Sequence, residues 1–259
     1  RWRFETGDRV KASPTVVDGT VYVTSRDGTL YALDTASGRV QWRASVGYSA
    51  ESSPTVADGT VYAGSFDGAL YAVDARTGRE RWRFETGDFV RSSPTVVDGT
   101  VHVGSSDSNL YALDAATGRE QWRFETADTE FGVQSSPTVA DGTVYVGAYD
   151  ANLYAVDAAT GDERWAFETG DVVVSSPTVV GDAVVVGSQD GSLYAVDRTA
   201  GTANWSLSTG GEVFSSPTAV SGTVYVGSGD GKLYGVSLGE TGASEGSRVD
   251  ARTLGHHAQ

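Results

Sequence analysis

The 259-residue sequence has no cysteine and no methionine, and only Lys11 and Lys232 are lysine. Without cysteine there are no disulfide bonds, thiolate metal sites or cysteine nucleophiles. No apolar run approaches the roughly 18 residues that a membrane-spanning helix requires, so we expect no transmembrane segment. These absences leave the compartment open, with an extracellular or cell-surface location favoured.

Negative charge is in excess, since acidic residues outnumber basic ones by 34 to 19 and the formal net charge is −15. A field of this sign repels phosphate backbones, which argues against a nucleic-acid partner. The composition resembles that of proteins from salt-loving organisms, in which about 1 M salt screens like-charge repulsion within roughly 3 Å. We therefore expect a halophilic protein whose fold loosens in dilute buffer.

Six internal repeats account for nearly the whole sequence. The phrase Ser-Pro-Thr recurs at steps of 40 or 43 residues and contains every proline: Pro14, Pro54, Pro94, Pro137, Pro177 and Pro217. The tryptophans recur at the same steps: Trp2, Trp42, Trp82, Trp122, Trp165 and Trp205. A period of this length is typical of stacked repeat architectures.

Each repeat predicts four short antiparallel strands. In the second repeat these are "SPTVA" (53–57), "VYAGS" (61–65), "LYAVD" (70–74) and "RWRFET" (81–86), with a tight Asp-Gly turn after the first. Asp-Gly tolerates the positive φ that such hairpins require. Four strands every ~40 residues indicate propeller blades. We therefore expect an all-β, six-bladed β-propeller.

The first eight residues, "RWRFETGD", repeat a fourth strand without the three strands that precede it elsewhere, whereas the sixth repeat has three strands and no tryptophan. The sequence therefore predicts that residues 1–8 complete the last blade and close the ring. We expect one domain over residues 1–238, with blades at 11–50, 51–90, 91–133, 134–173, 174–213, and 214–238 plus 1–8, and a flexible tail at 239–259. A fragment of a larger propeller is the alternative.

The segment before each tryptophan identifies the family. "AVDARTGRERW" (72–82) and "AVDAATGDERW" (155–165) resemble the tryptophan-docking motif A-x-D-x-x-T-G-x-x-x-W of pyrroloquinoline-quinone-like β-propeller repeats, and the resemblance covers residues 1–238. Departures from it include Ala200 at the threonine position and Ser237 at the aspartate position. The resemblance implies that all six tryptophans have a structural role, fastening neighbouring blades.

Family members are either dehydrogenases that use the quinone with calcium, or cofactor-free propellers such as the one in the bacterial outer-membrane protein assembly machine. The dehydrogenases have eight blades and long insertions, whereas this sequence has six tight repeats and one three-residue insertion. We therefore expect a non-catalytic, monomeric scaffold without cofactor or metal that binds a protein, peptide or ligand. The alternatives are a quinone- and calcium-dependent dehydrogenase or its cofactor-free remnant, and an amplified or designed repeat protein with no specific partner.

Positions that differ between repeats are free for function, and two such positions are expected on one face: the residue two before each Ser-Pro pair, and the turn between the second and third strands. With the insertion, they give the candidate binding residues, here called the top-face set: Lys11, Arg26, Glu51, Phe66, Arg91, Phe131, Gln134, Tyr149 and Phe214. Ser106, Tyr48 and Phe89 occupy related loop positions outside this set. Loops on a rigid scaffold commonly carry binding residues. The alternative is an ordinary surface on which Lys11, Glu51 and Arg91 pair with each other.

Other residue types suggest no chemistry. His102 stands where other repeats have tyrosine, which predicts a core position. The aspartates of the Asp-Gly turns lack the further ligands of a calcium loop, so we assign them to turn formation. The serines have no histidine neighbour with which to form a catalytic triad.

Overall fold

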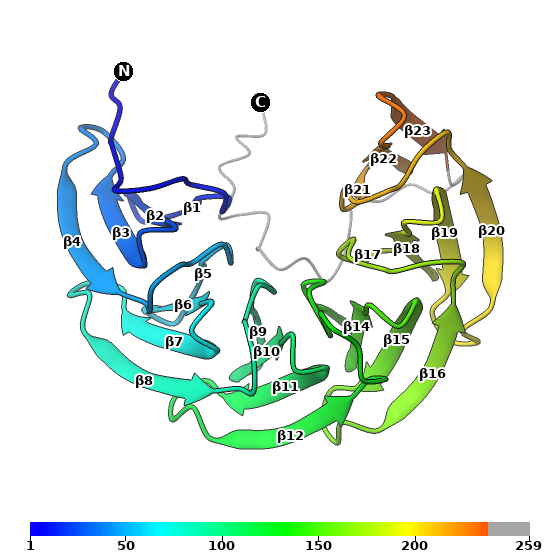
Figure 1. Ribbon diagram of the computed structural model, residues 1–259, viewed down its shortest axis with the longest axis horizontal. Coiled ribbons are helices and arrows are strands. Elements are labelled where there is room, and N and C mark those ends of the chain that lie inside the picture. Colours follow the sequence, from blue (N-terminus) through cyan, green and yellow to red (C-terminus); the bar gives the residue numbers. More distant parts are fainter. Residues whose placement is uncertain (238–259) are drawn as a thin grey trace. The chain divides into compact units, whose positions relative to one another are not determined.

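The computed structural model describes residues 1–237, and its regular elements are the strands β1 to β23 (Figure 1). The expectation of an all-β chain is confirmed. Residues 238–259, which include the expected tail, lie outside the described residues. The described chain divides into two compact units, residues 1–107 with 111–121, and residues 108–110 with 122–237.

The first unit contains two four-stranded antiparallel sheets in chain order. These are β1 (Thr15–Val17), β2 (Thr20–Thr24), β3 (Thr29–Asp34) and β4 (Val40–Ser45), then β5 (Thr55–Ala57), β6 (Thr60–Gly64), β7 (Ala69–Asp74) and β8 (Glu80–Glu85). A third sheet has residues in both units: β9 (Thr95–Val97), β10 (Thr100–Gly104), β11 (Asn109–Asp114) and β12 (Glu120–Glu125).

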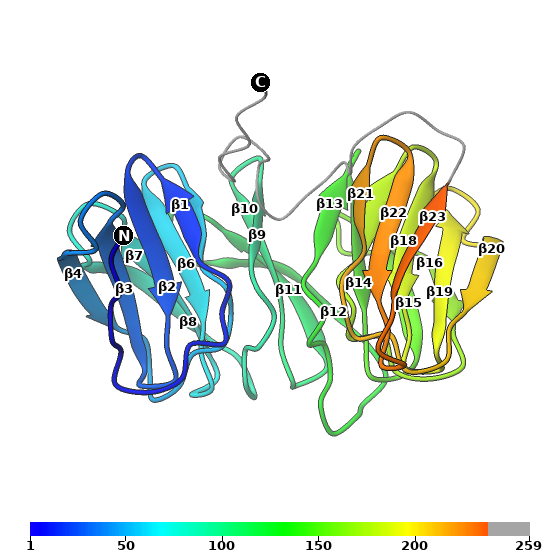
Figure 2. The same cartoon turned by 90° about the horizontal axis from the view of Figure 1, so that it is seen from above.

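The second unit contains two further four-stranded sheets and one of three strands. The former are β13 (Thr138–Ala140), β14 (Thr143–Gly147), β15 (Asn152–Asp157) and β16 (Glu163–Glu168), then β17 (Thr178–Val180), β18 (Ala183–Gly187), β19 (Ser192–Asp197) and β20 (Ala203–Ser208). The three-stranded sheet is β21 (Thr218–Val220), β22 (Thr223–Gly227) and β23 (Leu233–Ser237), whose strands run side by side in Figure 2. Residues 1–8 form no strand.

In the first four repeats, the tight turn between the first two strands follows from an Asp-Gly pair. At Asp58 and Gly59, φ is 46° and 69°, and Asp98 and Gly99 have 47° and 75°. Two consecutive positive φ angles are what a type I′ hairpin requires, and aspartate followed by glycine adopts them at low cost. The predicted hairpins are confirmed.

Apolar side chains form cores between consecutive sheets within each unit. One core joins Leu30 and Val46 of the first repeat to Val61 and Tyr71 of the second, and all four are at most 5% exposed. His102 is 2% exposed, so its predicted core position is confirmed. The alternating strands thus bury one face against the next sheet, as stacked blades must.

The tryptophan side chains of β4, β8, β12 and β16, together with Trp2, each contact a turn of a neighbouring sheet. The indole N–H groups of Trp2, Trp42, Trp82, Trp122 and Trp165 donate at 2.9–3.0 Å to the backbone carbonyls of Thr35, Ala75, Ala115, Ala158 and Arg198. Glycine is required beneath each ring, because a Cβ added at Gly78 would lie 2.7 Å from Trp42. Each indole is thereby buried on one side with its donor satisfied.

The Ser-Pro-Thr phrase connects the innermost strands. The Thr55 hydroxyl donates to the Pro94 carbonyl at 2.6 Å, and the Ser53 N–H donates to the Ser93 hydroxyl at 3.0 Å. Ser136 and Thr138 make the same two bonds to the next repeat of the second unit. The phrase recurs because both of its hydroxyls satisfy backbone groups of a neighbouring repeat, one as acceptor and the other as donor.

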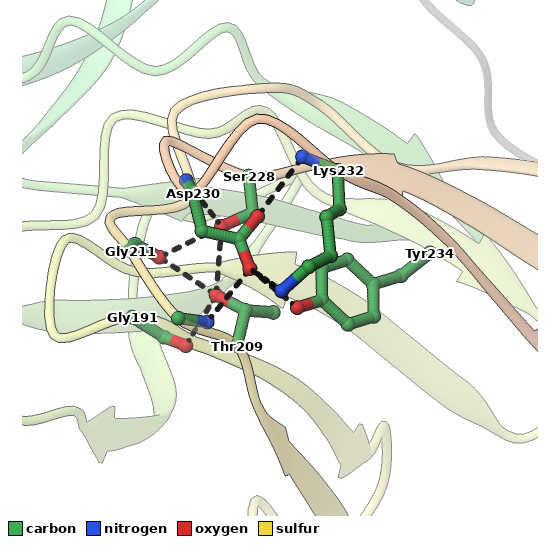
Figure 3. Close-up of polar contacts among 8 residues, drawn as sticks. Gly191, Thr209, Gly211, Ser228, Asp230, Lys232 and Tyr234 are labelled. Atoms are coloured by element: carbon green, nitrogen blue, oxygen red, sulfur yellow. Dashed lines mark hydrogen bonds and ion pairs between the residues drawn. The ribbon is translucent and has the colours of Figure 1, made fainter.

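A third contact uses the aspartate of the turn between the second and third strands. Asp230 accepts a hydrogen bond from the Tyr234 hydroxyl at 2.6 Å (Figure 3). It also accepts one at 3.1 Å from the Gly210 N–H, which follows the fourth strand of the preceding repeat. Nearby, the Ser228 hydroxyl lies 2.9 Å from that of Thr209. These aspartates therefore connect two repeats as well as forming the turn that the sequence predicts.

Replacement of Gly118 by alanine is expected to destabilise the protein more than replacement of Gly99. Both glycines have a φ above +70°, so both variants carry the same backbone strain of about 1–2 kcal/mol. A Cβ at position 118 would also lie 2.6 Å from the Trp82 ring, whereas one at 99 has nothing within 4 Å. Overpacking adds about 1–3 kcal/mol. Urea unfolding measures the free energy of unfolding of both variants. Equal decreases in this free energy would contradict a role for the contact with the Trp82 ring.

Stability is expected to fall in acid through the turn aspartates. Burial alone would raise the pKa of Asp190, but hydrogen bonds from Tyr194, Gly170 and Ser192 hold that pKa below its usual range. A depressed folded-state pKa stabilises the protein above the unfolded value of about 3.9, and this contribution is lost as the pH falls through the folded value.

We therefore expect D190N to have a lower melting temperature than the wild type at pH 7. Between pH 4 and pH 2, its melting temperature should fall by less than that of the wild type. D182N is the matched control, since Asp182 is exposed and its carboxylate has no hydrogen bond among the described residues. Melting curves of D190N and wild type that shift in parallel with pH would refute this explanation.

Candidate functional site

Two loops of each repeat are held together at one end of its sheet. The turn before the third strand donates a backbone hydrogen bond to the loop that enters the innermost strand, as in Arg26 to Arg9 at 3.0 Å, Phe66 to Ser49 at 2.8 Å and Tyr149 to Gly132 at 3.0 Å. Both kinds of variable position lie on these loops. Within each unit, these bonds hold the two kinds of variable position at the same end of a sheet.

Three charged members of the top-face set meet in the first unit. The Glu51 carboxylate forms an ion pair with Lys11 at 3.2 Å and a very short hydrogen bond with the Arg26 Nε. The Glu51 side chain is 17% exposed, against 52% for Lys11. The alternative interpretation of a paired surface therefore holds for Lys11 and Glu51.

Arg91 is arranged differently, because it lies over two aromatic rings. Phe66 and Phe89 stack with centroids 5.1 Å apart and planes at 17°. The Arg91 guanidinium carbon is 4.7 Å from the Phe66 centroid and 5.6 Å from that of Phe89. Arg91 makes no ion pair within residues 1–237, contrary to the alternative in which it pairs with Glu51.

Buried polar atoms without a partner lie beside this stack. They include the Arg91 Nε and the Ser106 hydroxyl, each without a hydrogen bond among the described residues. Ser106 is 5% exposed, and its backbone N–H donates to the Phe89 carbonyl at 2.8 Å. Unsatisfied buried donors are uncommon in native proteins, so these two atoms indicate a place where a ligand can supply acceptors.

The second unit gathers the members from the insertion and the fourth repeat. The Tyr149 hydroxyl lies 3.4 Å from the Gln134 Oε1, and the Phe131 and Tyr149 rings are 5.2 Å apart. The Gln134 amide nitrogen is buried without a partner in the described chain. Phe214 is 51% exposed and makes no aromatic contact with the other described residues. Three of these four residues therefore form one cluster.

The sequence analysis placed Phe89 and Ser106 on the relevant loops but left both out of the top-face set. The missed signal was the pair Phe66 and Phe89, which are the only phenylalanines at their two loop positions. Whether they stack depends on loop geometry, which repeat comparison does not provide. The described residues contain no group of three or more histidine, cysteine, aspartate or glutamate side chains placed to hold a metal ion.

Comparison with protein families gives one match. The model of the family described as outer membrane protein assembly factor BamB matches residues 49–138 and 109–254. Among curated protein sequences, none matches this chain significantly. Within residues 1–237 no helix is long and apolar enough to cross a membrane.

Solved structures are similar in fold. BamB from Moraxella catarrhalis has a TM-score of 0.80 at 23% identity, with 95% of this chain and 79% of that chain covered. The computationally designed Ika8 protein has a TM-score of 0.78 at 20% identity, with 94% of this chain and 76% of that chain covered. Quinohemoprotein alcohol dehydrogenase ADHIIG from Pseudomonas putida HK5 has 0.73 at 21% identity, covering 87% of this chain but 52% of that chain. At these identities the likeness concerns the fold, and the sheets resemble BamB propeller blades.

Proposed function

The chain belongs to the PQQ-like β-propeller repeat family described as outer membrane protein assembly factor BamB, and on this premise we propose that it is a non-catalytic scaffold that binds a partner protein through its top-face set. The observation that carries the proposal is the gathering of Lys11, Arg26, Glu51, Phe66 and Arg91 on adjacent loops of the first unit. The scaffold acts as a monomer without cofactor, in an organism adapted to salt.

Physical arguments support a protein partner. Arginine and aromatic residues are enriched among the residues that dominate interface energies. Here the two types are combined in one stack, on loops that the Ser-Pro-Thr bonds and tryptophan contacts hold to rigid sheets. Preorganised loops lose little conformational entropy on binding, which favours affinity.

The quinone alternative has one observation in its favour, the structural likeness to a quinohemoprotein alcohol dehydrogenase. A quinone needs an open aromatic face on which to stack. At the stack of Phe66 and Phe89, Arg91 already covers the rings at 4.7 and 5.6 Å. The residues of this site therefore do not fit the quinone, and we assign no redox step to them.

The binding role predicts that the triple variant E51A/F66A/R91A loses a partner that the wild type captures from extracts of its own organism. The matched control is R39A/E80A/R119A, which removes three exposed side chains beside the turns that lead into fourth strands. The captured protein, once purified, should bind the wild type one-to-one in calorimetry. Since hot-spot residues cost about 2 kcal/mol or more each, the triple variant should weaken binding by about 100-fold or more.

Equal binding by both triple variants would refute the top-face assignment. Saturable, micromolar binding of pyrroloquinoline quinone with calcium in multimolar salt would instead support the dehydrogenase alternative. No heat from the quinone, together with a partner lost only in the top-face variant, is the result that the proposal expects.

We also propose that residues 1–8 form the fourth strand of the last sheet and so close a six-bladed ring. Toward the first sheet these residues make the contacts that other fourth strands make toward the sheet after them: Trp2 donates to Thr35, and the Phe4 and Tyr31 rings meet edge to face at 5.1 Å. Phe84 and Tyr111 meet in the same way, at 5.2 Å.

The last sheet offers a place for such a strand. Leu233 of β23 is 74% exposed, whereas the equivalent Leu70 and Leu193 are fully buried. In complete sheets the third-strand residue before this leucine faces a fourth-strand residue, as Ala69 faces Glu85. The same register would place Glu5 opposite Lys232, which joins opposite charges across the strands.

Ring closure therefore predicts that E5C/K232C forms a disulfide within one chain under mild oxidation. Directly opposed residues have Cα atoms about 4.5–5.5 Å apart, which a disulfide spans. The chain has no other cysteine, so the product is unambiguous. The control R1C/K232C is four residues out of register, about 13 Å along the strand, and should stay reduced. A covalent dimer, or no cross-link, would contradict closure within one chain.

A further inference from the structure

We propose that Arg91, Phe66, Phe89 and Ser106 form a binding site for a carboxylate carried by the partner protein. This inference rests on the protein-binding role proposed above and names the chemical group that the first unit recognises. Four observations carry it: the ring stack, the unsatisfied donors, the occupation of nearby carboxylates, and the local balance of charge.

The ring stack fixes the cation. The guanidinium lies 4.7 and 5.6 Å from two centroids whose rings are nearly parallel, at 17°. Arginine stacked on aromatic rings retains its N–H donors, which form a planar fork that matches the two oxygens of a carboxylate. The rings thus hold the fork in place before the ligand arrives, and this reduces the entropy lost on binding.

The unsatisfied donors point to an anionic acceptor. The Arg91 Nε and the Ser106 hydroxyl are buried and form no hydrogen bond within the described chain. Leaving such groups unpaired lowers the stability of the folded protein, and a charged donor lowers it more than a neutral one. A carboxylate has two oxygens that together accept about four hydrogen bonds, so one group can serve the guanidinium and the hydroxyl.

Nearby carboxylates of the chain are already engaged. Glu51 pairs with Lys11 and Arg26, and Asp88 accepts from the Phe89 N–H at 2.7 Å. Asp67 accepts from the Tyr71 hydroxyl at 2.5 Å. Each of these bonds would have to break before the carboxylate could move to Arg91. A carboxylate from another molecule meets no such competition.

The local charge selects a singly charged group. Around the site, the cations Lys11, Arg26 and Arg91 are matched by the carboxylates of Glu51, Asp67 and Asp88, so the surroundings carry no net positive charge that would hold a polyanion. The chain as a whole has a net charge of −15, which repels polyanions over longer distances. A single aspartate, glutamate or chain-terminal carboxylate gains the local attraction with the least repulsion.

The test follows the arginine Nε–H resonances of the uniformly ¹⁵N-labelled full chain, in the lowest salt that keeps its circular dichroism unchanged. The Arg91 resonance is assigned by its absence in R91K. The probes are acetyl-Gly-Glu-Gly-amide, its glutamine analogue, acetate and inorganic phosphate. We expect the glutamate peptide to shift the Arg91 resonance saturably and the glutamine peptide to leave it in place.

Variants sharpen the result. S106A and F66L should each weaken binding of the glutamate peptide by several-fold. R91K keeps the positive charge but loses the planar fork of donors, so it should weaken binding by about tenfold. The Nε–H resonance of Arg119, an exposed arginine whose side chain makes no hydrogen bond or ion pair in the described chain, is the internal control and should not shift. Folding of each variant is checked by its circular dichroism spectrum.

Four outcomes overturn the inference: no shift with any carboxylate, equal shifts with both peptides, an equal shift at Arg119, or tighter binding of phosphate. Acetate that binds as tightly as the peptide would support the carboxylate site but assign it to small acids. The readout needs no identified partner. If no partner is captured but the Arg91 resonance shifts with the peptide, only the protein-binding role is refuted. If a partner is captured but the Arg91 resonance does not shift, only this site is refuted.

Discussion

The contact between an indole and the glycine turn of the next sheet is the interaction on which the rest of this architecture depends. A four-stranded sheet alone cannot bury both of its faces, so each repeat is stable only against a neighbour. The Trp82 indole lies on Gly118 and donates to the Ala115 carbonyl at 3.0 Å, which combines apolar burial with a satisfied donor. One side chain therefore sets both the distance and the orientation of the next sheet.

Two polar contacts support this one at the other ends of the strands. The Ser-Pro-Thr hydroxyls bind backbone groups between innermost strands, and the turn aspartates accept a backbone N–H from the preceding repeat. All three contacts use backbone groups of the neighbour, so they tolerate change in most of its side chains. This explains how the repeats can differ at loop positions while every sheet keeps the same register.

The loops held by these contacts carry the candidate site. Because the turn before each third strand is bonded to the loop that enters the innermost strand, their side chains are displayed on a rigid base. In the first unit, variation at these positions has produced an ion-paired group around Glu51 and a separate cation–π stack at Arg91. The two arrangements differ in chemistry, since the Glu51 carboxylate is paired with two cations, whereas the Arg91 Nε–H has no acceptor among the described residues.

The sequence by itself determined the strands, the hairpins and the repeat period, because these follow from local rules: apolar alternation, Asp-Gly turns and a fixed spacing of proline and tryptophan. It also placed His102 in the core, since a residue in a tyrosine position of a repeat shares the environment of that tyrosine. Among the candidate residues, it assigned Lys11, Glu51 and Arg26 to loops that the structure holds next to one another.

Only the tertiary structure decided how these side chains pair. Arg91 lies on Phe66 and Phe89, whereas the loop that carries Glu51 places its carboxylate against Lys11 and Arg26 of the first repeat. Spacing along the chain cannot distinguish these outcomes, which differ by a few ångströms between side chains of different loops. The two buried donors at Arg91 and Ser106 are likewise visible only once the loops are folded, since burial is a property of the packed molecule.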